Sequence, residues 1–260
     1  MKKILVNMTG RHNFAIPELM EFDENIDVGT ILEQNWMLYE IADRFPGGRM
    51  VYVFPIDRDV YTLDKGGVRH AFLQAHGSSI IACYAEEMRK RNAGRIYRLG
   101  TCGSLQRDAE IGDVVLATAA IRDEGTSNQY VAPYFPAVAD PHLVTEFERR
   151  LGNKGIPIHT GITWTTDGRF VESNEKISSF SRMGVKSVDM ETSALLTVCY
   201  LHGIPALSIS VVTDRPIDDL EKDFKGEIPD TQRNRIMLSE RVYQIVSSIL
   251  DSSNNMRSGD

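Results

Sequence analysis

Four short polar clusters contain residue types that could bind or transform a small polar molecule. The first is RLGTCGS at residues 98–104, which continues an apolar run. A strand that ends in this way exposes backbone N–H groups, and Arg98 would add a guanidinium fork that can bind a phosphate through two hydrogen bonds. The alternative is a glycine-rich turn whose arginine pairs with a surface carboxylate. This cluster alone favours neither interpretation.

The second cluster places two carboxylates around a methionine, in VDME at residues 188–191. Asp189 and Glu191 are costly to bury unless they bind something polar. A sugar diol fits, because one carboxylate can accept hydrogen bonds from two hydroxyls while Met190 packs against the ring. The alternative is acidic charge at a helix N-terminus, where it interacts well with the helix dipole. That alternative explains Glu191 and leaves Met190 unexplained.

Two further clusters contain single residues that could transfer a proton or bind an anion. Asp214 ends an apolar strand beside Arg215, a position at which its pKa could be tuned for proton donation. Taken alone, this segment favours an aspartate that starts a turn before Pro216. His76 precedes Gly77 and a helix N-terminus, which is a ready anion site. A structural histidine is the alternative there.

The elements that must position these clusters alternate along the chain. Short apolar, β-branched runs predict strands at residues 4–8, 50–54, 95–99, 113–118, 160–164 and 206–212. Amphipathic stretches predict helices at residues 32–45, 78–92, 141–151, 174–183, 191–202 and 231–250.

This alternation predicts the α/β class: a single domain with a mostly parallel, mixed central sheet surrounded by helices. We expect the domain to span residues 1–252, with a frayed tail at 253–260, and a functional loop region at 119–140. Ligands in such sheets bind outside the carboxyl ends of the strands. The four polar clusters lie at or just after predicted strand ends, so we expect them to form one site.

Composition excludes several other classes. The 260 residues carry a formal net charge of −7, which argues against general nucleic-acid binding. Three widely spaced cysteines fit neither a disulfide framework nor a CxxC metal site. No apolar run is long enough for a membrane span or a signal peptide, so we expect a cytoplasmic protein. The sequence contains no GxGxxG, P-loop or HExxH motif, which argues against the common nucleotide cofactors and a catalytic zinc.

Six segments, taken together and in order, resemble the hexamer-type nucleoside phosphorylase family, which includes purine nucleoside phosphorylases, uridine phosphorylases and related nucleosidases. They are AHGSSIIACYAEEM, IYRLGTCGSL, GDVVLATAAIRDEGTSNQY with FPAVAD, ITWTTDGRF, VDMETSALL and VVTD, and they cover residues from about 70 to 215.

The resemblance implies a pentosyltransferase of purine salvage that assembles as a homodimer or hexamer. It would cleave a nucleoside to free base and ribose 1-phosphate, with inorganic phosphate as co-substrate and no other cofactor.

The resemblance also implies a role for each matching residue. Asp214 would be the catalytic acid that protonates the leaving base. The implied phosphate ligands are Arg98, Thr101, Gly10, Arg11 and Arg58. The implied ribose-binding residues are Met190, Glu191 and His76. The residues implied near the base are Phe170, Asp189, Cys102 and Gly103.

The beginning of the chain departs from the family pattern. Family members open with a phosphate loop of the form PGDPxR, whereas NMTGRH stands here at residues 7–12, so Gly10 and Arg11 match only partly. Arg58 is the candidate for an arginine supplied by a neighbouring subunit. If neither Arg11 nor Arg58 reaches the site, water becomes the nucleophile and the protein is a nucleosidase of the same fold, a hydrolase of nucleosides or of AMP. A catalytically silent nucleoside-binding protein is the third hypothesis.

The base is expected to be a purine. Uridine phosphorylases of this family grip the pyrimidine with a Gln and an Arg, and the segment GRFVESN at residues 168–174 contains no Gln-x-Arg. They also lack an acid at the position of Asp214. A purine leaves readily only when its N7 is protonated, which is the task expected of Asp214.

Overall fold

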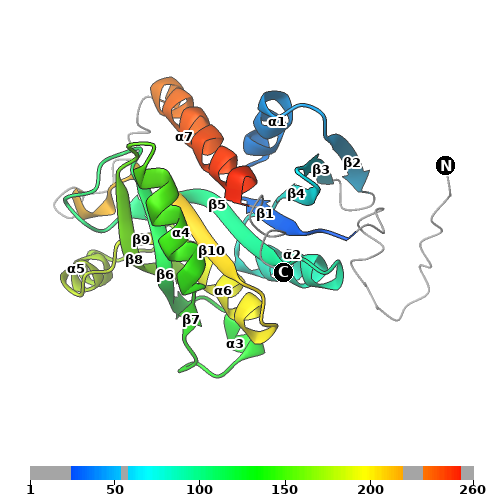
Figure 1. Cartoon of the computed structure of the whole chain (residues 1–260). Helices are drawn as coiled ribbons and strands as arrows, with labels where there is room; N and C mark the ends of the chain where they lie inside the picture. The colour runs from blue at the N-terminus through cyan, green and yellow to red at the C-terminus, as the bar shows by residue number, and fades with distance from the viewer. Residues whose placement is uncertain (1–24, 54–57, 219–230, 253–260) are drawn as a thin grey trace.

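The computed structural model describes residues 25–53, 58–218 and 231–252, and a ten-stranded mixed sheet runs through its centre (Figure 1). The strand order is β10-β6-β8-β9-β5-β1-β4-β3-β2, with β7 paired to β6 and a further pairing between β10 and β5. The strands are β1 (Val28–Leu32), β2 (Arg49–Val53), β3 (Arg58–Lys65), β4 (Val68–Gln74), β5 (Arg95–Ser104), β6 (Val114–Asp123), β7 (Ala137–Val138), β8 (Ile158–Thr166), β9 (Ser187–Asp189) and β10 (Ala206–Asp214).

Parallel pairings form the middle of the sheet. Strand β5 runs parallel to β1 on one side and to β10 on the other, and β1 runs parallel to β4. Antiparallel pairings join β2, β3 and β4, and others join β6 to β10 and β5 to β9. The predicted α/β class with a mixed central sheet is therefore confirmed. The end of β5 meets β10 and β9, which brings three of the polar clusters to one edge of the sheet.

Helices cover the sheet in two groups. In Figure 1, α1 and α7 lie above the central strands, and α2 and α6 lie below them. Helix α6 is buried along nearly its whole length because it packs against both α2 and the sheet, which explains why its sequence is apolar on all sides. The helices are α1 (Asn35–Arg44), α2 (Ser78–Lys90), α3 (Ser127–Tyr130), α4 (Pro141–Gly152), α5 (Asn174–Arg182), α6 (Thr192–Leu201) and α7 (Thr231–Ser252), with a short 3₁₀ turn, η2 (Pro216–Asp218).

The main differences from the predicted elements lie near the N-terminus. The strand predicted at 4–8 falls outside the described residues. Strand β1 was not predicted, and the helix predicted from residue 32 begins at Asn35 instead. All five residues of β1 are buried between β4 and β5, so the run VGTIL shows no alternation of apolar and polar side chains that would identify a strand.

The segment expected to be a functional loop is partly regular. Residues 119–123 continue β6, and α3 and β7 follow within the same stretch. Of the helices that the structure describes, none combines the length and the apolar character needed to cross a membrane. The expected domain boundaries, 1–252 and 253–260, stay predictions, since both ends of the chain lie outside the described residues.

Candidate active site

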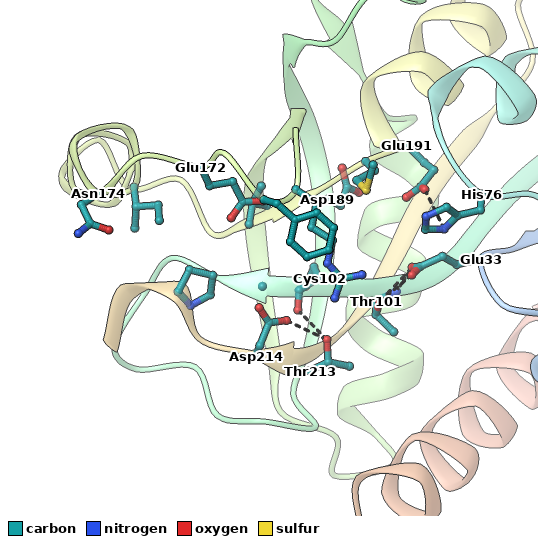
Figure 2. Close-up of a pocket in the computed structure, with 17 residues that line it drawn as sticks. Glu33, His76, Thr101, Cys102, Glu172, Asn174, Asp189, Glu191, Thr213 and Asp214 are labelled. Atoms are coloured by element: carbon teal, nitrogen blue, oxygen red, sulfur yellow. Dashed lines mark hydrogen bonds and ion pairs between the residues drawn. The ribbon is translucent and has the colours of Figure 1, made fainter. Parts of the chain in front are cut away.

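A cavity of about 400 Å³ opens where β5, β9 and β10 end, at the edge of the sheet expected from the sequence. This volume lies in the range of small-molecule sites. Five acidic residues belong to its wall: Glu33, Glu172, Asp189, Glu191 and Asp214. In Figure 2, Glu33 and Glu191 lie at one end of the cavity, beside His76, and Asp214 and Glu172 lie toward the other.

Arg98 lies beside Glu33 and Glu191, at their end of the cavity, and is only 1% exposed. Its guanidinium is bound by three carboxylates: Nη2 lies 2.6 Å from Glu191 Oε2 and 3.1 Å from Glu33 Oε2, and Nη1 lies 3.2 Å from Asp189 Oδ2. Nη1 also donates a 2.6 Å hydrogen bond to Ser210 Oγ. These carboxylates raise the pKa of Arg98 against the opposing effect of burial, so the guanidinium stays charged.

The groups expected to bind phosphate therefore bind a side chain of the chain itself. Thr101 donates its backbone N–H to Glu33 Oε2 at 2.5 Å, and its hydroxyl donates to Glu33 Oε1 at 2.9 Å. Arg98 donates to the same carboxylate. Arg98 and Thr101 lie together, as the sequence analysis expected. In this structure both donate hydrogen bonds to the carboxylate of Glu33.

Glu191 is buried in the cavity wall with part of its hydrogen-bonding capacity unused. It is 1% exposed, it accepts a 2.7 Å hydrogen bond from the backbone N–H of Gly77 on Oε1, and Arg98 binds its Oε2. A carboxylate has about four acceptor positions, so two remain for hydroxyl groups. His76 Nδ1 lies 3.6 Å from Glu191 Oε1, and Met190 belongs to the same wall. The three residues expected at the ribose are thus brought together.

Asp189 is held by different hydrogen-bond donors from those of Glu191. Its carboxylate accepts hydrogen bonds from both Thr165 Oγ1, at 2.7 Å, and the hydroxyl of Thr192, and it also pairs with Arg98. Burial raises its pKa, and the side chain is fully enclosed. These partners favour a role in holding Arg98, and the contact with the base expected for Asp189 stays a prediction.

Asp214 ends β10 at the opposite side of the cavity. Its carboxylate accepts a 3.0 Å hydrogen bond from Thr213 Oγ1, and the residue is exposed. The apolar strand before it is buried, whereas the aspartate itself, at the strand end, is exposed. Gly103 in β5 allows Asp214 and Pro216 to lie close to the backbone of that strand: a Cβ on residue 103 would lie 2.8 Å from Pro216 Cγ and 3.2 Å from Asp214 Oδ2. The residue expected to be the acid therefore faces the cavity, which solvent can enter.

The other residues expected near the base also line this space. Phe170 is 84% exposed, with the Arg169 guanidinium 5.8 Å from the centre of its ring. Cys102 is buried, and burial raises the pKa of its thiol, so it stays uncharged. Phe170, Cys102 and Gly103 are all part of the cavity wall, but their contacts with a base stay predictions. The described His, Cys, Asp and Glu residues form no group of three or more that could hold a metal ion.

The remaining phosphate candidates are only partly visible. Gly10 and Arg11 lie outside the described residues. Arg58 begins β3, and the antiparallel register of β3 with β4 places this end of β3 beside the carboxyl end of β4, near the cavity edge. Its side chain is not among those the structure describes.

Two acidic cavity residues, Glu33 and Glu172, were missed by the sequence analysis. Burial and the negative charge of Asp214 raise the pKa of Glu172 to about 7. Its position within GRFVESN gives no periodic or motif signal. Glu33 would have been found only by recognising β1 as a strand, because a polar residue directly after a buried strand lies at the ligand edge of the sheet.

Comparison with known proteins agrees with this geometry. Residues 48–251 match the model of the phosphorylase superfamily. A guanosine phosphorylase of Halorubrum lacusprofundi is 29% identical over 168 residues, covering 64% of this chain and 70% of that protein. A uridine phosphorylase of Thermococcus kodakarensis is 32% identical over 149 residues, covering 52% of this chain and 54% of that protein, so this match spans about half of the relative's length.

The fold has relatives among solved structures. A uridine phosphorylase of Vibrio fischeri superposes with a TM-score of 0.75 at 20% identity, covering 87% of this chain and 92% of that one. The predicted enzyme class, a pentosyltransferase of the nucleoside phosphorylase type, is confirmed at the level of the family. The six ordered segments, the mixed sheet and the family match lead to one conclusion: the chain belongs to the phosphorylase superfamily.

Proposed function

We propose that the chain cleaves the N-glycosidic bond of a nucleoside. The observation that carries this proposal is a single cavity, lined also by Met190, with Glu191 at one end and Asp214 at the other. Breaking the bond from C1′ to the base nitrogen leaves positive charge on the sugar and negative charge on the base. Carboxylates at the sugar end stabilise the first charge, and an acid at the far end neutralises the second.

The proposed base is a purine. The names of the relatives include both a guanosine and a uridine phosphorylase, so family membership does not choose between the two classes of base. Support comes from the two carboxyl groups at the far end of the cavity. Glu172, with its pKa of about 7, is protonated in about half of the molecules at neutral pH, in the cavity that Asp214 also lines. A purine needs a proton at N7 to leave, and this pair can supply it.

Family membership supports phosphorolysis, in which inorganic phosphate attacks C1′ and ribose 1-phosphate is released without a further cofactor. Hydrolysis is the second candidate, and it is favoured by the Glu33 carboxylate on the donors of Thr101. A homodimer or hexamer that acts in cytoplasmic purine salvage completes the proposal. Exposed aromatic side chains such as Tyr134 and Tyr200 support self-association.

A nucleoside panel tests the proposed function directly. Purified protein is incubated with adenosine, inosine, guanosine and uridine, with and without phosphate, and free base, ribose and ribose 1-phosphate are separated by chromatography. We expect base to be released from the purine nucleosides and much less from uridine. Release from uridine alone would contradict the purine assignment, and release from none would contradict glycosidic cleavage.

Glu172 gives this activity an expected pH dependence. Burial and the charge of Asp214 raise its pKa to about 7, so its proton is present below that pH and is lost above it. The kcat/KM for inosine should therefore fall as the pH rises through about 7. Glu172→Gln should remove this limb of the profile, and Glu175→Gln, on the adjacent helix α5, should leave it in place. A variant profile that superposes on the wild type would show that Glu172 does not supply the proton.

A further inference from the structure

Glu124 is a buried carboxylate that lies directly after β6 and outside the cavity wall. The residue is 5% exposed. Its Oε2 accepts a 2.6 Å hydrogen bond from the backbone N–H of Thr126 and one of 3.0 Å from the backbone N–H of Ser127. Its Oε1 accepts hydrogen bonds from the hydroxyls of Ser127 and Ser193, the second at 2.9 Å. Burying a carboxylate is costly unless its acceptor positions are filled, and these donors fill them.

The hydrogen bond from Ser193 joins Glu124 to the segment that forms the Glu191 end of the cavity. Ser193 belongs to the first turn of α6, and Glu191 lies directly before that helix. The hydroxyl of Ser193 donates to Glu124, and its backbone N–H donates to Thr165 Oγ1 at 3.0 Å. Thr165 Oγ1 in turn donates to Asp189 Oδ1 at 2.7 Å. The turn from Asp189 to Ser193 is therefore held at both ends, and Glu191 lies between them.

Helix α2 holds the same turn from the side of the cavity. The backbone N–H of Gly77 donates to Glu191 Oε1 at 2.7 Å, and Ser78 Oγ donates to the carbonyl of Met190 at 2.7 Å. Glu124 holds the start of α6 from the other direction. Because a side chain follows the backbone that carries it, the place of the Glu191 carboxylate depends on both supports. A misplacement of about 1 Å in a binding group can cost on the order of 10²-fold in rate.

The neighbours of Glu124 in the chain support other segments. The backbone N–H of Gly125 donates to Asp167 Oδ2 at 2.9 Å, and Asp123 accepts a 2.7 Å hydrogen bond from Lys176 Nζ in α5. Asp167 and Lys176 stand on either side of the wall residues at the far end of the cavity. Successive residues at the end of β6 therefore support different parts of the cavity, so the effect of Glu124 is separable from theirs.

We propose that Glu124 is a positioning residue for the sugar: through Ser193 it fixes the turn that presents Met190 and Glu191. This inference rests on the proposed cleavage of a nucleoside. Glu124 lies outside the cavity wall, so it acts through the hydrogen bond from Ser193. Loss of this bond should weaken contacts with the sugar half of a nucleoside and leave those with the base half unchanged. A role confined to the stability of the fold would not distinguish the two halves.

The first arm of the test measures binding without turnover. The probes are 9-deazainosine, whose carbon–carbon link between sugar and base cannot be cleaved, and its free base, 9-deazahypoxanthine. Titration calorimetry gives the Kd of each probe for wild type and for Ser193→Ala, which loses the hydroxyl and keeps the backbone hydrogen bond to Thr165. We expect the Kd of the nucleoside to rise by about 10-fold and that of the base to change by less than about 2-fold.

The second arm asks whether Ser193 acts through Glu191. In a Glu191→Gln background the contact that the turn positions is already impaired, so adding Ser193→Ala should raise the Kd of 9-deazainosine much less than it does in wild type. Residues that act as one unit show this loss of additivity, whereas independent residues do not.

Two further variants bracket the effect. Glu124→Gln should weaken nucleoside binding at least as much as Ser193→Ala, because the amide nitrogen cannot accept a hydrogen bond and one set of donors loses its acceptor. Ser248→Ala is the matched control: Ser248 is a buried serine of α7 whose hydroxyl donates to the carbonyl of Gln244 at 3.0 Å. It should leave both Kd values unchanged. Circular dichroism and thermal unfolding establish that each variant is folded.

The outcomes separate the two proposals. If wild type binds 9-deazainosine and Ser193→Ala binds it equally well, the positioning role is wrong and the proposed function stands. Equal weakening of nucleoside and base, or an equal loss in the wild-type and Glu191→Gln backgrounds, would likewise overturn the inference. If wild type neither binds 9-deazainosine nor cleaves any nucleoside, the proposed function fails and the inference fails with it.

Discussion

Replacing Arg98 with alanine is expected to lower the free energy of unfolding by about 3–5 kcal/mol, the usual cost of removing one partner from a buried ion pair. The guanidinium is 1% exposed and is the shared partner of Glu33, Asp189 and Glu191. Without it, three carboxylates would repel one another in a site that excludes most water. Urea denaturation of the purified variant measures the change.

The matched control is Arg89→Ala, which removes a half-buried pair with Glu86 on α2 and should cost less than about 1 kcal/mol. Equal unfolding free energies for the two arginine variants would show that Arg98 does not neutralise the acidic cluster. Sequence reasoning would predict a selective loss of phosphate binding for this variant; the structure predicts a loss of stability.

Replacing Asp214 with asparagine should slow the cleavage of inosine by about 10²-fold or more, because asparagine cannot act with Glu172 in passing a proton to the base. The fold should persist, since Asp214 is an exposed strand-end residue and the change creates no cavity. The measurement is kcat for inosine and for 7-methylinosine. The methylated base already carries its positive charge and leaves without a proton, so its cleavage should fall far less.

The paired substrates separate chemistry from folding. An unfolded variant would lose both activities in the same proportion, whereas loss of the acid affects inosine selectively. Thr213→Val is a useful companion, because it removes the 3.0 Å hydrogen bond to Asp214 Oδ1 and leaves the carboxyl group in place. Wild-type rates on both substrates for Asp214→Asn would reduce Asp214 to the start of the turn before Pro216.

The sequence predicted much of the fold because long apolar strands and amphipathic helices carry a strong local signal. The polar clusters at the ends of β5, β9 and β10 were predicted to meet, and they do meet. Strand β10 runs parallel to β5, so the carboxyl ends of these two strands share an edge of the sheet, and the short antiparallel strand β9 pairs with the last residues of β5. Strand β1 was missed because it is short and buried on both faces. Glu33, which follows it, was therefore missed as well.

The function of Arg98 shows why a residue's role is harder to predict than its place. Its position beside Thr101 follows from four adjacent letters of sequence, RLGT. Its partners do not, because Glu33 and Glu191 are 65 and 93 residues away along the chain. An arginine near glycines binds phosphate or carboxylate with the same fork, so only the three-dimensional structure shows which of them is present.

Strand β5 limits how stable this fold can become. Glycine inside a strand usually weakens it by roughly 0.5–1 kcal/mol relative to alanine, so such positions are obvious targets for engineering heat resistance. Here Gly100 and Gly103 lie on the central strand, yet added methyl groups would collide with Glu33 and Pro216 at 2.5 and 2.8 Å. Adaptation to high temperature would have to proceed elsewhere, such as in the outer strands β2 and β3. Gly100 and Gly103 have to stay glycine because the shape of the cavity leaves no room for a side chain there.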